Sequence, residues 1–261
     1  MNKYFRFHII ALYIMIILVG CDRKTMIDGN DVSYFFTNKQ VLSLILAAEK
    51  GNVETIKELV AAGVNINTIG EGGITPLTWA ILSNNYNGIS GLLNNGADPN
   101  LSSARYGSVV ALAAGGEDIE ILEALLKHGG DPDSFNYRGR TPLLTSIGQH
   151  RWNNMRLLLK YGGDINKLDI HQNFTPLILA ASHGQYEQVY YLLTHGADYK
   201  VKDRNSYTVA HMLNYPVGDA SPWKKKVQTL LEGYGITFPL PRPNGDPWFK
   251  NRDKHLGKPV L

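Results

Sequence analysis

Four aspartates recur at nearly constant spacing, and paired carboxylates are the usual groups for general acid–base chemistry. Each follows a glycine-containing turn, and together they are Asp98, Asp131, Asp164 and Asp198. A catalytic pair must share one site, whereas residues spaced so regularly occupy equivalent positions in successive units. Aspartate at a turn accepts hydrogen bonds from nearby backbone N–H groups. We therefore predict that these four side chains stabilise turns.

Other catalytic and metal-binding patterns are absent from the sequence. His128 and His195 lie three residues before two of the aspartates, about two repeat units apart, so they cannot share a metal ion. There is no HExxH motif, no G-x-S-x-G nucleophile elbow and no phosphate-binding glycine loop of the Walker type. The single cysteine, Cys21, excludes an intramolecular disulfide and a cysteine-rich zinc site. We expect no enzyme activity, cofactor, metal or small-molecule substrate.

The overall charge is too small for a dedicated nucleic-acid binder. The 261 residues include 26 Lys and Arg and 23 Asp and Glu, a net charge of +3. Without residues 1–20, which carry Lys3 and Arg6, the net charge is +1. Hydrophobic residues at 44% and charged residues at 19% are typical of a folded globular chain. We expect no nucleic-acid partner.

A repeat of about 33 residues organises most of the chain. Its register is set by Thr75-Pro-Leu, and the equivalent positions are Ser108, Thr141, Thr175 and Thr208, with a first unit that opens at Leu42. Thr followed by Pro suits a helix N-cap and the first helical position. The pattern resembles the ankyrin repeat. The resemblance implies an all-α solenoid of about six helix-turn-helix repeats with extended inter-repeat loops, over residues 40–236.

Several departures from the repeat carry expectations of their own. The third unit has Ser108-Val-Val in place of Thr-Pro-Leu and Gly115-Gly116 after its first helix, so we expect it to be looser. Trp79 takes the position of Leu46, Leu112 and Leu179 and should be core. The sixth unit carries an insertion over residues 215–222, as in an atypical terminal repeat. Residues 237–261 contain five prolines and should form an extended tail pinned by Trp248 and Phe249.

The N-terminus reads as an export signal. Lys3, Arg6 and His8 precede an apolar run from Ile9 to Val19, which is about 16 Å long as a helix and too short to span a bilayer. The run ends in Leu18-Val-Gly-Cys21, which resembles a bacterial lipobox. The resemblance implies a signal peptide over residues 1–20 and lipid attached to Cys21. Two or three acyl chains would hold the protein on a membrane.

The resemblance to lipoproteins also suggests a location. Residues 21–39 would tether the repeats to the lipid, with Tyr34, Phe35 and Phe36 docked on the solenoid. The protein would face the periplasm, and Asp22 after the lipidated cysteine favours the inner membrane. An alternative for Cys21 is an ordinary cysteine behind a secretory signal.

Ankyrin repeats generally bind proteins through loop tips and the concave face of the first helices. Aromatic and arginine side chains, which are favoured in interfaces, gather at the tips of this chain. The candidate partner-binding residues are Glu71, Arg105, Tyr106, Tyr137, Arg138, Arg140, His171, Asn173, Phe174, Arg204 and Tyr207. The alternative for each is packing between neighbouring tips.

Small ankyrin lipoproteins of this layout resemble the immunity proteins of type VI secretion lipase effectors. The resemblance implies a membrane-tethered inhibitor that binds a phospholipase toxin. One alternative is a periplasmic scaffold or assembly factor that supports an envelope enzyme without inhibiting it. Another is a cryptic hydrolase in the basic C-terminal tail, although that tail contains no nucleophile–base pair.

Overall fold

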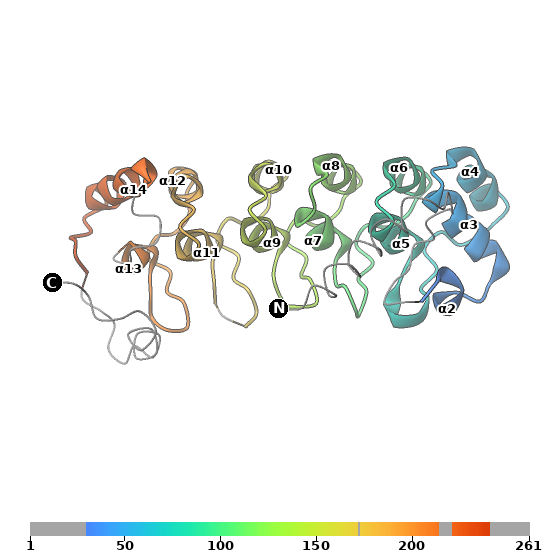
Figure 1. Cartoon of the computed structure of the whole chain (residues 1–261), viewed down its shortest axis with the longest axis horizontal. Helices are drawn as coiled ribbons and strands as arrows, with labels where there is room; N and C mark the ends of the chain where they lie inside the picture. Colours follow the sequence, from blue (N-terminus) through green and yellow to red (C-terminus); the bar gives the residue numbers. More distant parts are fainter. Residues whose placement is uncertain (1–29, 172, 214–220, 241–261) are drawn as a thin grey trace, which may run out of the picture.

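The computed structural model describes residues 30–171, 173–213 and 221–240, and these form stacked helix pairs (Figure 1). The first helices of the pairs are α3 (Lys39–Glu49), α5 (Pro76–Leu82), α7 (Val109–Ala114), α9 (Pro142–Gly148), α11 (Pro176–Ser182) and α13 (Val209–Met212). The second helices are α4 (Val53–Ala61), α6 (Tyr86–Asn94), α8 (Ile119–Lys127), α10 (Trp152–Lys160), α12 (Tyr186–Thr194) and α14 (Pro222–Gly233). The predicted all-helical solenoid is confirmed for the described part of the chain.

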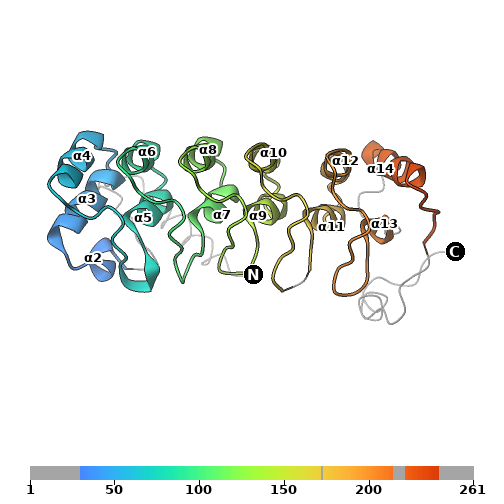
Figure 2. The same cartoon turned by 180° about the vertical axis from the view of Figure 1, so that it is seen from behind.

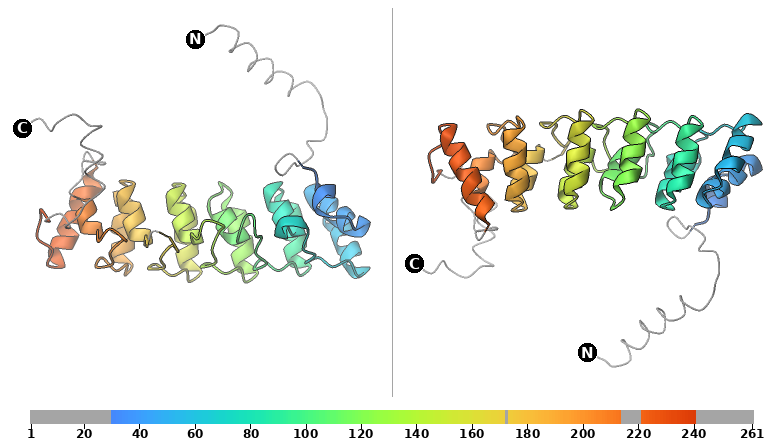
Figure 3. Two further views of the ribbon diagram at one scale, coloured as in Figure 1. Left: turned by 90° about the horizontal axis from the view of Figure 1, so that it is seen from below. Right: turned by 90° about the horizontal axis from the view of Figure 1, so that it is seen from above.

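The first and second helices form two parallel rows, and long loops project from the row of first helices (Figures 1 and 2). Seen from below and from above, the helix pairs lie side by side along the solenoid (Figure 3). Each loop has a tip that precedes the next first helix. The short helix η1 (Glu71–Gly73) is the tip of the second repeat. The loop tips and the first helices therefore share one face.

Side-chain caps fix the starts of the first helices. The hydroxyls of Thr75, Thr141 and Thr175 accept hydrogen bonds from the N–H three residues on, at 3.1, 3.2 and 3.2 Å. Ser108 Oγ accepts from the N–H groups of Val110 and Ala111, so the third repeat is also capped. The predicted looseness of that repeat is not seen in its cap, although α7 is one residue shorter than α9.

The core lies between the two rows and continues from repeat to repeat. Trp79 is fully buried, as predicted. Of its equivalents, Leu46 is 38% exposed and Leu112 is half-buried. Burying apolar surface in this way supplies most of the stability of a solenoid, in which each repeat contacts only its neighbours.

The four turn aspartates act as predicted. A side-chain oxygen of each accepts the N–H two residues on, at 2.8 Å. A second ladder was not predicted: the side chains of Asn67, Asn100, Asp133 and Asn166 accept the N–H of the aspartate in the next repeat, at 2.8–2.9 Å. Each of these bonds joins two adjacent repeats.

Asp133 is the one carboxylate in this second ladder, and its replacement by Asn is expected to stabilise the protein. Burial raises the pKa of Asp133, and the like charges of Asp164 and Asp131 raise it further. A raised pKa means that the ionised form is disfavoured in the folded state, so stability falls as the pH rises through it. Asp133→Asn keeps the acceptor oxygen. We expect a gain of about 0.5–1 kcal/mol at pH 7.

Urea unfolding at pH 7 and pH 4 checks this prediction. The gain should shrink at pH 4, because lowering the pH toward the raised pKa of Asp133 reduces the cost of its ionised form. A loss of stability at pH 7 would contradict it. The control is Asp198→Asn, which makes the same chemical change at an equivalent turn aspartate two repeats away.

An N-terminal segment packs against the first two repeats. Helix α2 (Val32–Phe35) contacts α3 and η1, and Val32, Phe35 and Phe36 are buried. The predicted docking of Phe35 and Phe36 is confirmed, whereas Tyr34 is 58% exposed and is not docked. The Phe35 ring lies 5.8 Å from the Trp79 ring, centroid to centroid.

Several sequence predictions fall outside the described residues. They are the signal peptide, Cys21, Asp22, most of the insertion in the sixth repeat and the tail from residue 241 with Trp248 and Phe249. Within the described ranges, no helix has both the length and the apolar character required to span a bilayer.

Candidate protein-binding groove

A groove of about 500 Å³ opens on the loop side of the solenoid, between the third and fourth repeats. Its walls come from the loop tips of these repeats and include Tyr106, Tyr137, Arg138 and Arg140. Its floor comes from α7 and α9 and the turns that follow them, and is made of Ala111, Leu112, Gly115, Gly116, Thr145, Gly148 and Gln149. Four of the predicted binding residues thus meet at one central site.

Hydrogen bonds within the fourth tip fix the position of its two arginines. Asn136 Oδ1 accepts the N–H groups of Arg138 and Arg140, at 2.8 and 3.0 Å. The Arg140 carbonyl in turn accepts the Asn136 N–H at 2.9 Å. Gly139 has a φ of +69°, which allows the tight turn between the arginines. The backbone therefore holds both arginine Cα atoms at the edge of the groove.

Both neighbouring tips support the fourth tip. The Ser108 N–H donates to the Phe135 carbonyl at 3.0 Å, and Gly107 pairs with Asn136 as an isolated β-bridge. On the other side, the Ile170 N–H donates to the Gly139 carbonyl at 3.0 Å. A loop held from both sides loses little conformational entropy when it binds a partner.

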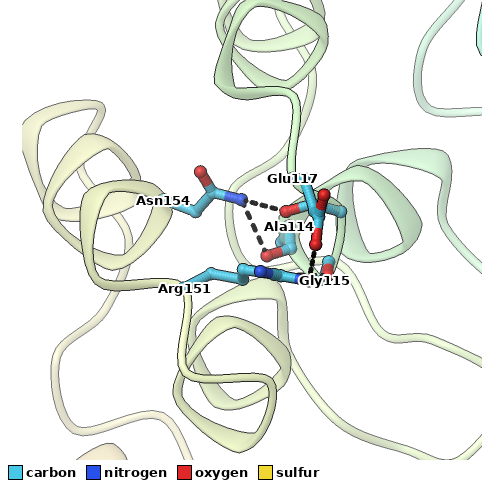
Figure 4. Close-up of polar contacts among 6 residues, drawn as sticks. Ala114, Gly115, Glu117, Arg151 and Asn154 are labelled. Carbon is cyan, nitrogen blue, oxygen red and sulfur yellow. Dashed lines mark hydrogen bonds and ion pairs between the residues drawn. The ribbon is translucent and has the colours of Figure 1, made fainter.

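Glycines at the end of α7 keep the floor of the groove open. Two side chains at the start of α10, those of its N-cap Arg151 and of Asn154, hold that segment in place (Figure 4). Asn154 Nδ2 donates to the carbonyls of Ala114 and Gly116, both at 3.0 Å. Arg151 Nε donates to the Gly115 carbonyl at 3.2 Å, and its guanidinium pairs with Glu117 at 3.1 Å. These bonds satisfy the carbonyls at the end of a short helix.

The exposed charges at the tips of the third to sixth repeats are positive. Arg105, Arg138 and Arg204 are exposed and Arg140 is half-buried. The acidic residues of these tips, Asp169 and Asp203, are buried, and each accepts backbone N–H groups of its own loop. Within the described ranges, neither Arg138 nor Arg140 forms an ion pair. Arg138 lies 5.1 Å from the centre of the Tyr137 ring.

Two histidines lie together on the turns after α9 and α11, and the positive charge of Arg140 acts on one of them, His183. The rings of His150 and His183 are stacked with centroids 5.9 Å apart, and His150 Nδ1 lies 2.9 Å from Gln185 Nε2. Burial lowers the pKa of His183, and electrostatic repulsion from the neighbouring His150 and Arg140 lowers it further. The lowered pKa favours the neutral form of His183 at pH 7.

Replacing Arg140 with Gln is expected to raise the pKa of His183. The substitution removes one of the two sources of electrostatic repulsion that disfavour the imidazolium, while burial and His150 continue to hold the pKa below its ordinary value. NMR titration of the His183 ring protons measures the shift. Lys160→Gln removes a positive charge from α10 and should leave the titration unchanged. An unchanged pKa in Arg140→Gln would contradict the arrangement.

The remaining predicted residues do not line this groove. Glu71, Arg105, His171, Asn173 and Arg204 are exposed at other tips or edges, and Phe174 packs partly against the core. Tyr207 is a correction: its side chain is 4% exposed, with the ring against His211, so it is not available to a partner. Ile74, at the equivalent position, is also fully buried. In these two repeats the residue before the N-cap points inward. Arg140, at the same position of the fourth repeat, is instead half-buried and lines the groove.

Sequence reasoning missed the residues that hollow out the groove. In the sequence, Gly115 and Gly116 predict only a looser third repeat, and Ala111 and Gly148 carry no prediction. The signal was present, since a pair of small residues ends α7 where the first repeat has Glu49-Lys50. Glycines at the end of one helix leave a depression only when the equivalent residue in the next repeat is also small. Gly148, at the end of α9, meets that condition.

The structure brings no catalytic constellation together in its described part. Among the described residues there is no group of three or more His, Cys, Asp or Glu side chains that could hold a metal ion. The groove offers guanidinium groups, aromatic rings and backbone atoms, which suit binding.

Comparisons with known proteins agree with this description. The family model for ankyrin repeats in three copies matches residues 15–103 and 109–203, more than half of the chain. The human DNA-binding protein RFXANK is 34% identical over 89 residues, which is 34% of each chain, so the match spans about a third of that relative.

Two solved structures share the fold. The ankyrin repeat domain of Bcl-3, a member of the IkappaB protein family, has a TM-score of 0.66 at 24% identity and covers 78% of this chain and 90% of its own. The ankyrin repeat protein EF0377 has a TM-score of 0.62 at 25% identity, over 75% of this chain and 99% of its own. Ankyrin repeats are protein-interaction modules that are typically not enzymes, and this chain belongs to the ankyrin-repeat family.

Proposed function

We propose that this protein is a membrane-tethered periplasmic inhibitor that binds a phospholipase toxin delivered by a type VI secretion system and protects the cell that makes it. The observation that carries the proposal is the combination of a lipobox-like sequence, ending at Cys21, with a protein-binding array. A lipid anchor on the inner membrane would keep the inhibitor beside the surface that a phospholipase attacks. Tethering raises the effective concentration of one partner near the other.

The groove provides a surface suited to this role. Arg138 and Arg140, which form no ion pair with any described residue, lie beside two tyrosines and can bind an acidic and aromatic surface of an enzyme. Interface residues of these types contribute most of the binding energy in protein complexes. An inhibitor that covers an active site needs no catalytic residues of its own.

Capture from the native strain tests this function. A tagged chain of residues 22–261 is used to recover partners, which are identified by mass spectrometry. We expect a phospholipase at a ratio near one to one, inactive in the complex, and a cell without this protein should be killed by that enzyme. The control is the same chain with Arg138→Gln and Arg140→Gln. Recovery of an envelope enzyme that stays active would contradict the proposal and support the scaffold.

A further inference from the structure

A segment of the chain itself, helix α2, occupies the surface between the first and second repeats. Helix α2 lies on the loop side of the first and second repeats, against α3 and η1. Phe35 packs on Trp79, and Gly70 is so close to the backbone oxygen of Phe35 and the ring of Phe36 that a Cβ there would clash. A short aromatic segment therefore fills this part of the concave face.

The position of α2 corresponds to that of the groove, shifted by two repeats. Residues 66 positions after Trp79 and Gly70 are Thr145 and Asn136, and both line the groove. The same shift carries η1 onto the tip at Tyr137 and α3 onto α7. The groove between the third and fourth repeats is thus the counterpart of a place that the chain fills with its own aromatic side chains.

The two places differ in their charge and in the depth of their floor. Arg138 and Arg140 stand where the second repeat has Gly72 and Ile74. Gly115 and Gly116 stand where the first repeat has Glu49 and Lys50. The groove therefore has room for a ring above its floor and has two guanidinium groups at its edge that bind no carboxylate of the described chain.

We propose that this groove binds a short segment of the partner protein that places an aromatic side chain on the glycine floor and a carboxylate against Arg138 and Arg140. This inference rests on one part of the proposed function, namely that the groove is the surface that binds the partner protein. An aromatic ring gives the large contact area that a shallow apolar floor favours. Arginine pairs with carboxylates through two parallel hydrogen bonds, which selects an acidic residue beside the ring.

Calorimetric titration of the full chain in detergent with defined peptides tests the inference. The probe copies residues 31–36, Asp-Val-Ser-Tyr-Phe-Phe, followed by Glu-Glu. One comparison peptide has Gln in place of each acidic residue, and another has Ala in place of both Phe. We expect the probe to bind at least tenfold more tightly than either comparison peptide.

Three variants of the protein separate the two parts of the site. Arg138→Gln with Arg140→Gln should remove the preference for the acidic probe over its Gln form. Gly148→Leu should block binding of the probe and of its Gln form. A Cβ at this position would have only the Arg140 guanidinium within 4 Å, at 3.6 Å, so the leucine side chain would extend into the groove. Lys127→Gln with Lys160→Gln removes two charges from the second helices of the same repeats and should bind like the unaltered chain. Circular dichroism confirms that each variant is folded.

Equal binding of the acidic and Gln peptides to the unaltered chain would overturn the inference. So would sedimentation showing a dimer that competes with the probe, because the groove would then take α2 of a second copy. These results are independent of the proposed function. A phospholipase that is still inhibited by a chain with no peptide preference would place its binding elsewhere, whereas a confirmed peptide preference without inhibition would remove only the inhibitory role.

Discussion

A chain carrying Arg138→Gln and Arg140→Gln is expected to bind its protein partner at least 100-fold more weakly than the unaltered chain. Each guanidinium can make a charge-assisted hydrogen bond with a net value of about 1.5–3 kcal/mol. A 100-fold loss corresponds to about 2.7 kcal/mol, so two such bonds account for it. The arginines lie at the centre of the array, where interface residues are best shielded from water.

Surface plasmon resonance with the captured partner measures the change in affinity. The matched control is Lys127→Gln with Lys160→Gln, which lowers the net charge equally in the same two repeats. If both pairs of substitutions weaken binding to the same extent, the loss of affinity comes from the lower net charge, and the groove is not the binding site. If neither weakens it, the partner binds another face.

The largest effect on stability is expected from Asn154→Leu. The Asn154 side chain is 3% exposed and donates to two backbone carbonyls of the preceding repeat. Leucine has a similar volume, so it excludes water while leaving both carbonyls unpaired. A buried acceptor without a partner costs about 1–3 kcal/mol, and we expect a total loss of about 2–4 kcal/mol.

Unfolding in urea, followed by circular dichroism, measures this loss. Because repeats are coupled only to their neighbours, a weakened junction between the third and fourth repeats should also make the transition broader. Asn153→Leu makes the same chemical change at the adjacent exposed position of α10 and should leave stability nearly unaltered. A stable Asn154→Leu variant with a sharp transition would show that these hydrogen bonds contribute little.

Local patterns in the sequence predicted the helices and turns well. The Thr-Pro starts of α5, α9 and α11, the turn aspartates and the burial of Trp79 each depend on residues within one repeat. Their physics is short-range: a cap bonds the N–H three residues away and a turn aspartate the N–H two residues away. The regular spacing then gave the solenoid.

Contacts between repeats were predicted poorly, because they join residues about 30–40 positions apart. Asn154 contacts the end of α7 across 38–40 residues, and nothing in the local sequence of α10 indicates it. The groove depends on Gly116 and Gly148 being small at the same time. The burial of Tyr207 has a related cause: tip residues look alike in sequence, although the residue before the N-cap packs into the core in the second and sixth repeats and lines the groove in the fourth.

The most direct test of the account is a titration of the captured phospholipase with this protein, while hydrolysis of phospholipid vesicles is followed. We predict that activity falls linearly to zero at one chain per enzyme. With Arg138→Gln and Arg140→Gln, inhibition should require at least 100-fold more protein. Full activity in the presence of a saturating amount of the unaltered chain would contradict the account, because the array would then bind the enzyme without blocking it.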